Sequence, residues 1–217
     1  GIGKGWQWDH LGEWFAARSS ALAFNDNSVD VTILPGETGF RAELDMTPST
    51  KYVSIINDLE TVGKDSTTAI EILKYPGSNI IRISGTIKET DKPVVKSLAI
   101  DEPGEFFLQC LREVLHKRGI KVKGRIKLLS QYTSPQVDPK TTILFRHKSK
   151  PLSEIIKLCN KNSYNFYAEQ LLKTIGLVES GLGSAKNGIN SVTRHLKSAG
   201  IDPATLNIVD GSGLSLL

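Results

Sequence analysis

Apolar and polar residues alternate most regularly in the first half of the chain. The alternation is clearest in Val29–Leu34 and recurs in Tyr52–Ile56, Ala69–Leu73 and Ile80–Ile87. Turn-forming residues separate these segments, among them the pair Asn57-Asp58, at spacings of roughly 8–12 residues. Short alternating segments with turns between them predict a small antiparallel sheet or a sandwich.

The pattern changes to a helical period after Asp101. Pro103 is a typical first helical residue and Gly119 a typical stop. Cys110 shares one helical face with Phe107 and other apolar residues, so we expect it to be a small buried hydrophobe. Three further helices are predicted over Pro151–Asn160, Phe166–Ile175 and Asn187–Ala199.

Lysine and arginine alternate with apolar residues over Ile120–Leu129, which predicts a strand with one basic face. A loop over Ser134–Lys140 and short strands over Thr142–Arg146 and Leu206–Val209 complete the prediction. A basic strand could bind nucleic acid, which predicts salt-dependent oligonucleotide binding. Because no aromatic residue is interleaved with the charges, we expect a solvated face and no nucleic-acid partner.

Composition narrows the class of protein. The 217 residues are 39% hydrophobic and 23% charged, with a formal net charge of +4. No window approaches the ~18 apolar residues that span a bilayer, so stable membrane insertion is not expected. Two cysteines exclude a disulfide-rich scaffold, and the four histidines form no short-range metal-ligand pattern. We therefore predict a soluble α+β chain of at least two folding units, with no metal and no cofactor. Because it begins at Gly1 and ends on an apolar run, we expect it to be part of a longer protein.

Ser163 and Asn165 stand between two predicted helices in the order S-x-N. Serine and asparagine are common helix N-caps, so either residue could satisfy free amides of the following helix. The same order is the second motif of serine acyl-transferases that cleave peptides or β-lactams. There a hydroxyl relays a proton near the nucleophile and a carboxamide binds the substrate amide.

The surrounding residues favour the second interpretation. Residues 162–172, NSYNFYAEQLL, resemble the second motif and following helix of D-alanyl-D-alanine carboxypeptidases. The most similar group is the class C low-molecular-mass penicillin-binding proteins, peptidase family S13. The segments GWQWDHLG (5–12) and DGSGLS (210–215) also resemble segments of this family, in the same order.

The resemblance implies a particular domain organisation. Residues 1–27 and 91–148 would form a mixed α/β insertion domain, with a β-rich, sandwich-like domain nested within it at 28–90. Residues 149–217 would form a helical, partial penicillin-binding domain of the transpeptidase-like fold. The family often has an arginine where Leu216 stands here.

The resemblance also assigns candidate site residues. Ser163 would be the proton-relay serine and Asn165 the ligand of the substrate amide. Trp6, Asp9 and Trp14 match positions where some members bind the free amino end of a stem-peptide side chain. A carboxylate beside aromatic rings attracts an ammonium group, although Asp9 could equally be a surface or capping carboxylate. Trp14 replaces a residue that is commonly tyrosine.

The implied protein is an exported serine-type D-alanyl-D-alanine carboxypeptidase or endopeptidase, periplasmic or extracellular. It would act on peptidoglycan stem peptides through an acyl-enzyme and would bind β-lactams. The chain contains no S-x-x-K and no K-T-G motif, because Lys173–Gly176 reads K-T-I-G within a predicted helix. Without the nucleophilic serine we expect the chain alone to be inactive. The alternative is a non-catalytic cell-wall-binding or interaction module of the same fold.

Overall fold

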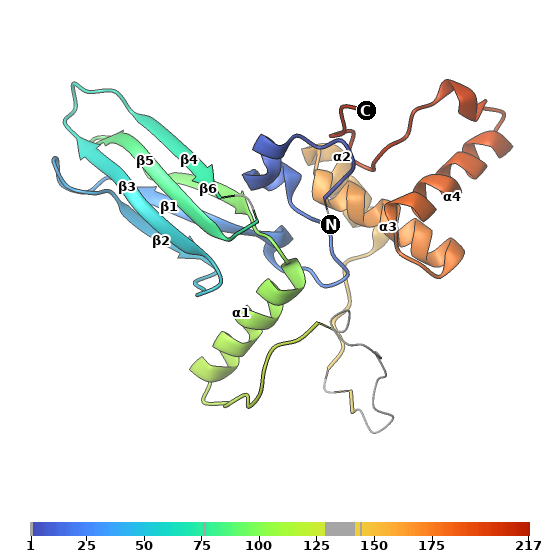
Figure 1. Cartoon of the computed structure of the whole chain (residues 1–217), viewed down its shortest axis with the longest axis horizontal. Coiled ribbons are helices and arrows are strands. Elements are labelled where there is room, and N and C mark those ends of the chain that lie inside the picture. Colours follow the sequence, from blue (N-terminus) through green and yellow to red (C-terminus); the bar gives the residue numbers. More distant parts are fainter. Residues whose placement is uncertain (1, 76, 129–141, 144) are drawn as a thin grey trace. The chain divides into compact units, whose positions relative to one another are not determined.

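Figure 1 shows the computed structural model of the chain, which describes residues 2–75, 77–128, 142–143 and 145–217. The chain divides into two compact units, residues 1–123 with 214–217 and residues 124–213. The strands of the described residues all lie in the first unit, and both units contain α-helices. The predicted α+β class is confirmed.

The first sheet of the N-terminal unit is antiparallel and has the strand order β2-β1-β6 (Figure 1). Its strands are β1 (Ser28–Leu34), β2 (Glu43–Thr47) and β6 (Val94–Ala99). The central strand β1 pairs with both neighbours, so that Val31 lies opposite Met46 on one side and Lys96 on the other. Its alternating valine and isoleucine side chains all point into the core.

The second sheet has the order β3-β5-β4. It consists of β3 (Ser54–Val62), β4 (Ala69–Lys74) and β5 (Ile80–Lys88). β4 and β5 are antiparallel, whereas β3 and β5 are parallel. The predicted turn at Asn57-Asp58 is wrong, because both residues lie inside β3. The Asn57 side chain donates a hydrogen bond to the carbonyl oxygen of Ala42 at 2.8 Å, which places a polar residue within a strand.

Both sheets and one helix share a single hydrophobic core. Buried residues of β1, β3, β5 and β6 pack together with Phe106 and Cys110 of helix α1 (Pro103–Lys117). Cys110 is buried as predicted, and burial raises the pKa of its thiol above the usual range. The buried face of α1 is centred on Phe106, and Val114, which lies one turn after Cys110 on the same helical face, is exposed.

The described residues of the second unit form the helices α2 (Leu152–Asn162), α3 (Asn165–Ser180) and α4 (Ala185–Ser198) and the short 3-10 helix η5 (Pro203–Thr205). α3 and α4 approach closely at Gly188, where an added Cβ would lie 2.1 Å from the carbonyl oxygen of Leu172. All three predicted helices are confirmed. Leu152 and Ile156 of α2, which the helical period predicts to face inward, are exposed.

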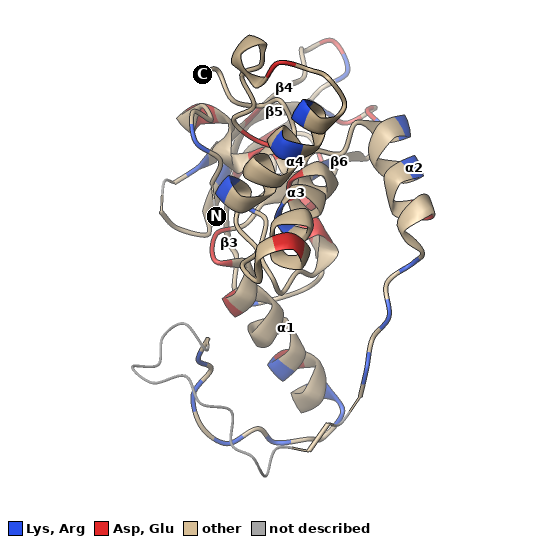
Figure 2. Cartoon of the chain, turned by 90° about the vertical axis from the view of Figure 1, so that its right-hand side faces the viewer, with Lys and Arg blue, Asp and Glu red and all other residues tan. Residues whose placement is uncertain are grey.

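Several strand predictions are wrong. Residues 120–128 form no strand and are mostly exposed, and Figure 2 shows basic residues along this segment after α1. Alternation alone does not make a strand. Leu206–Val209 is likewise irregular, as are the described residues of 142–146. The predicted loop at 134–140 lies outside the described residues.

Candidate active site

The S-x-N residues lie where α2 ends and α3 begins, with Ser163 and Tyr164 forming the bend and Asn165 the first residue of α3. Ser163 is the C-cap of α2, with the left-handed backbone angles φ 53° and ψ 47°. Its backbone N–H and that of Tyr164 both donate to the carbonyl oxygen of Cys159. Tyr164 then takes the N-cap position and Asn165 begins α3. The bend is therefore closed by backbone hydrogen bonds of α2.

The N-cap position of α3 is filled by neither candidate residue. Ser163 is exposed and Asn165 is half-buried, while the next residue, Phe166, is buried and anchors the helix start. A left-handed backbone is uncommon for a residue with a Cβ and costs about 1–2 kcal/mol. Left-handed residues commonly end helices, and Glu102 has a similar φ of 51°, so this backbone reflects the place of Ser163 at the end of α2.

The second candidate cluster lies in the first unit, near the N-terminus. Asp9 is exposed in the first turn of the 3-10 helix η1 (Trp8–Gly12). A backbone bridge from Glu13 to Leu98 holds this segment against β6. Asp9 lines a cavity of about 330 Å³ together with Trp8, which is 77% exposed. Among the described residues that line the cavity, Tyr75 supplies a second aromatic ring.

The structure does not group all three predicted pocket residues around this cavity. Trp6 is buried, and its ring lies against Gly3, where an added Cβ would be 2.2 Å from Nε1. Trp14 begins the 3-10 helix η2 (Trp14–Ala16) and is 39% exposed. In the described part of the chain, Asp9 lines the cavity but Trp6 and Trp14 do not. Sequence reasoning missed Trp8, although it lies next to Asp9 in the same aromatic segment.

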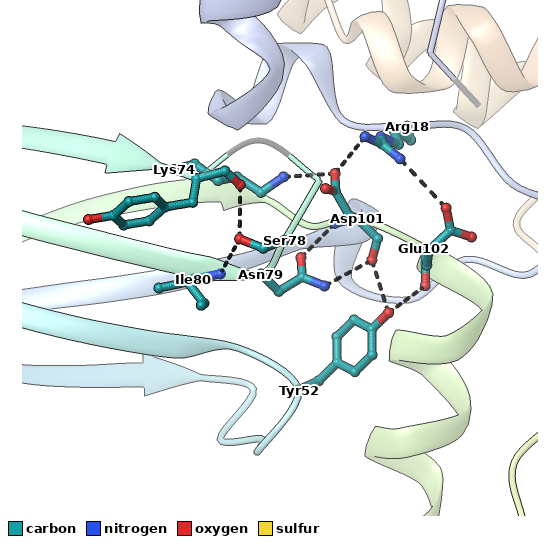
Figure 3. A network of polar contacts seen from close by, with 9 residues as sticks. Arg18, Tyr52, Lys74, Ser78, Asn79, Ile80, Asp101 and Glu102 are labelled. Carbon is teal, nitrogen blue, oxygen red and sulfur yellow. Dashed lines mark hydrogen bonds and ion pairs between the residues drawn. The ribbon is translucent and has the colours of Figure 1, made fainter.

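An ionic network forms one side of this cavity (Figure 3). Asp101 is 5% exposed, and its Oδ1 lies 2.8 Å from both Lys74 Nζ and Arg18 Nη2. The backbone N–H of Asp101 donates to Asn79 Oδ1 at 2.7 Å. Asp101 already pairs with both cations, whereas Asp9 and Glu13 are exposed carboxylates that line the same cavity.

Tyr52 closes the network from the opposite side. Its hydroxyl donates to the backbone carbonyl oxygens of Asp101 and Glu102, at 3.2 and 3.3 Å. Burial, followed by the negative charges of Glu105, Glu102 and Asp101, raises the pKa of Tyr52 from 10.0 to about 12. The folded chain therefore holds the Tyr52 proton at a pH at which the unfolded chain has lost it.

This difference predicts a loss of stability in strong base. As the pH rises from about 10 to about 12, the unfolded state releases the Tyr52 proton first, so the free energy of unfolding falls. Tyr52→Phe removes this proton and should flatten the decline within that window. Urea unfolding at a series of pH values, monitored by tryptophan fluorescence, measures the effect, and Tyr75→Phe is the control. Equal slopes for Tyr52→Phe and the unsubstituted chain would contradict the prediction.

Neither metal binding nor membrane spanning is indicated by the described residues. They contain no group of three or more histidine, cysteine, aspartate or glutamate side chains able to hold a metal ion. Likewise, no helix formed by these residues has the length and apolar character needed to cross a membrane.

The K-T-I-G segment lies within α3, as predicted.

Comparison with known families gives a match along the chain. The model of the D-Ala-D-Ala carboxypeptidase 3 (S13) family matches residues 2–217. The chain belongs to this family. The resemblance seen in the sequence motifs is thereby confirmed.

Curated relatives of this S13 chain are carboxypeptidases. A D-alanyl-D-alanine carboxypeptidase of Actinomadura sp. is 30% identical over 93% of the chain and 38% of its own length. The D-alanyl-D-alanine carboxypeptidase DacB of Haemophilus influenzae is 25% identical over 98% of the chain and 44% of its own length. The penicillin-sensitive carboxypeptidase A of Dictyostelium discoideum is 25% identical over 99% of the chain and 41% of its own length. The chain thus spans less than half the length of these relatives.

A solved structure confirms the fold. Penicillin binding protein 4 of Haemophilus influenzae superposes with a TM-score of 0.78 over 99% of the chain and 47% of its own length, at 21% identity. A second structure of that protein, in complex with a β-lactam, gives a TM-score of 0.71 at 20% identity, covering 93% of the chain and 45% of its own length. At these identities the likeness establishes the fold, and the roles of individual residues need a separate argument.

Proposed function

We propose that this S13 chain is part of a serine-type D-alanyl-D-alanine carboxypeptidase or endopeptidase that acts on peptidoglycan stem peptides. The observation that carries the proposal is the placement of Ser163 and Asn165. Family membership supplies the reaction class, and the bend presents an exposed hydroxyl two residues from a half-buried carboxamide.

The proposed roles follow from the chemistry of acyl transfer. A serine in another part of the intact protein bonds through its oxygen to the carbonyl carbon of the scissile amide, and the C–N bond breaks. The attacking serine hydroxyl loses its proton, which the Ser163 hydroxyl relays to the departing amine, and the Asn165 carboxamide orients the substrate amide. Water then hydrolyses the ester. A β-lactam would form the same kind of ester through its ring carbonyl.

Asp9 is proposed to attract a cationic group of the stem peptide. Its exposed carboxylate lines the cavity beside Trp8, and an ammonium gains both from the negative charge and from the face of an aromatic ring. Trp6 and Trp14, matched by resemblance, are proposed to complete this region. Trp14 is the more accessible of the two, with 39% of its surface exposed against 9% for Trp6.

The location of the intact protein follows from its proposed substrate. Peptidoglycan lies outside the cytoplasm, so we propose an exported, periplasmic or extracellular protein. The chain itself is expected to be inactive, since no S-x-x-K motif is present in its sequence to supply the acylated serine.

A labelled-penicillin gel tests the proposed function. The intact gene product should show a covalent band that unlabelled penicillin prevents, and the 217-residue chain alone should show none. Amino-acid analysis should detect D-alanine released from a stem peptide by the intact product. Absence of the band from folded intact product would overturn the proposed enzymatic function. Peptidoglycan binding without labelling would instead support a non-catalytic module.

A further inference from the structure

A buried glutamate of α3 binds the loop at residues 210–213. Glu169 is 2% exposed, and its Oε1 accepts three hydrogen bonds from this loop. The donors are the backbone N–H of Gly211 at 2.8 Å, the backbone N–H of Ser212 at 3.0 Å and the Ser212 hydroxyl at 2.9 Å. Hydrogen bonds to a carboxylate are about twice as strong as neutral ones, so this oxygen fixes the loop on the helix.

The loop sequence fits this arrangement residue by residue. Asp210 Oδ1 accepts the backbone N–H of Gly213 at 2.6 Å, and Gly213 has a φ of +74°. At Gly211 an added Cβ would lie 2.6 Å from the carbonyl oxygen of Ala168 and 3.1 Å from Leu172 Cβ. The loop backbone therefore lies directly on α3, and a side chain at position 211 would push it away.

The loop packs on the face of α3 that includes Asn165. Residues 165, 168, 169 and 172 follow the i, i+3, i+4, i+7 spacing that places side chains on one helix face. Ala168 and Leu172 contact the loop and Glu169 binds it. Asn165 stands one helical turn before Glu169, about 6 Å along the axis.

We infer that Glu169 is a positioning residue, which holds the 210–213 loop at a fixed place beside the Ser163/Asn165 pair. This inference rests on the proposed function, in which Asn165 orients the substrate. Glu169 acts through the loop and through its own helix, without itself contacting substrate. Because Glu169 and Asn165 share one rigid stripe, the loop and the carboxamide are fixed relative to each other. A shift of about 1 Å in such a site can cost about 100-fold in rate.

The first test measures the loop in the 217-residue chain itself. Amide hydrogen exchange at Gly211 and Ser212 should be at least about tenfold faster in Glu169→Ala, since a charge-assisted bond is lost at each amide. Glu169→Gln keeps an acceptor oxygen without the charge, so its effect should be smaller. Gly213 donates to Asp210 and serves as an internal reference. Glu179→Gln, on an exposed part of α3, is the matched control.

The second test measures the rate of covalent labelling by penicillin in the intact gene product. End-point labelling counts correctly folded molecules, so the rate per labelled molecule reports site geometry apart from any loss of fold. Glu169→Ala should lower this rate about 100-fold and Glu169→Gln about tenfold. Ser212→Ala removes one of the three donors to Glu169. Its labelling rate should lie between that of Glu169→Gln and that of the unsubstituted protein. Glu179→Gln should keep the full rate.

The outcomes separate the inference from the proposed function. Unchanged exchange at Gly211 and Ser212 in Glu169→Ala would show that the carboxylate does not hold the loop. Faster exchange with an unchanged labelling rate would reduce Glu169 to a structural role and overturn the inference. If the unsubstituted product takes no label, the proposed function fails and with it the positioning role, while the exchange data still decide whether Glu169 holds the loop.

Discussion

Asp101→Asn should lower the free energy of unfolding of the N-terminal unit by about 3–5 kcal/mol. The carboxylate is the shared partner of Lys74 and Arg18, whose side chains are only 8% and 19% exposed. The neutral amide takes away the negative charge that pairs with Lys74 and leaves Arg18 with Glu102, at 3.7 Å, in a poorly solvated site.

Asp58 provides a matched control for this substitution. It also joins two cations, Arg41 at 2.9 Å and Arg82 at 2.8 Å, but these side chains are 67% and 47% exposed. Asp58→Asn should therefore cost about 0–1 kcal/mol. Urea unfolding monitored by tryptophan fluorescence suits both variants, since all three tryptophans lie in this unit. Equal costs for the two substitutions would show that burial of the Asp101 network contributes nothing.

The fold could be predicted where a single face of an element is buried. β1, β4 and β5 alternate clearly, and the four helices carry an apolar stripe, so their positions follow from the sequence. The sequence prediction misses β2, although Leu44 and Met46 alternate with polar residues over its five positions. Residues 120–128 alternate as a strand would, but alternation reports only a possible face and cannot supply a neighbouring strand.

In the candidate site too, local features could be predicted from the sequence, whereas contacts between distant residues could not. The bend at Ser163 and Asn165 is local, so two helix ends and a short motif suffice to place it. The left-handed backbone of Ser163 could not be predicted, because serine does not favour it. The Asp101 network and the Glu169 loop contacts join residues far apart in the chain, such as Lys74 and Asp101 or Glu169 and Gly211. No periodic pattern in the sequence records such pairs.

Ser163→Gly should make the chain more stable while removing its proposed function. Glycine adopts a φ of 53° without the strain that a Cβ imposes, a gain of about 1–2 kcal/mol that the greater freedom of the unfolded chain reduces to about 0.5–1 kcal/mol. Ser163→Ala keeps the Cβ and should gain nothing. Thermal unfolding followed by far-ultraviolet circular dichroism distinguishes the two variants.

Both Ser163 variants lack the hydroxyl, so both should acylate with penicillin about 10²–10³-fold more slowly in the intact gene product. Asn165→Ala should slow the reaction by a similar factor, since the substrate amide loses its ligand. Asn162→Ala is the matched control, because this exposed asparagine ends α2 next to the bend. If Ser163→Gly were more stable and acylated at the normal rate, the serine would be only a strained helix end and the proton relay would have to lie elsewhere. A stability gain combined with a lost reaction would instead show that the strain at Ser163 is kept for its hydroxyl.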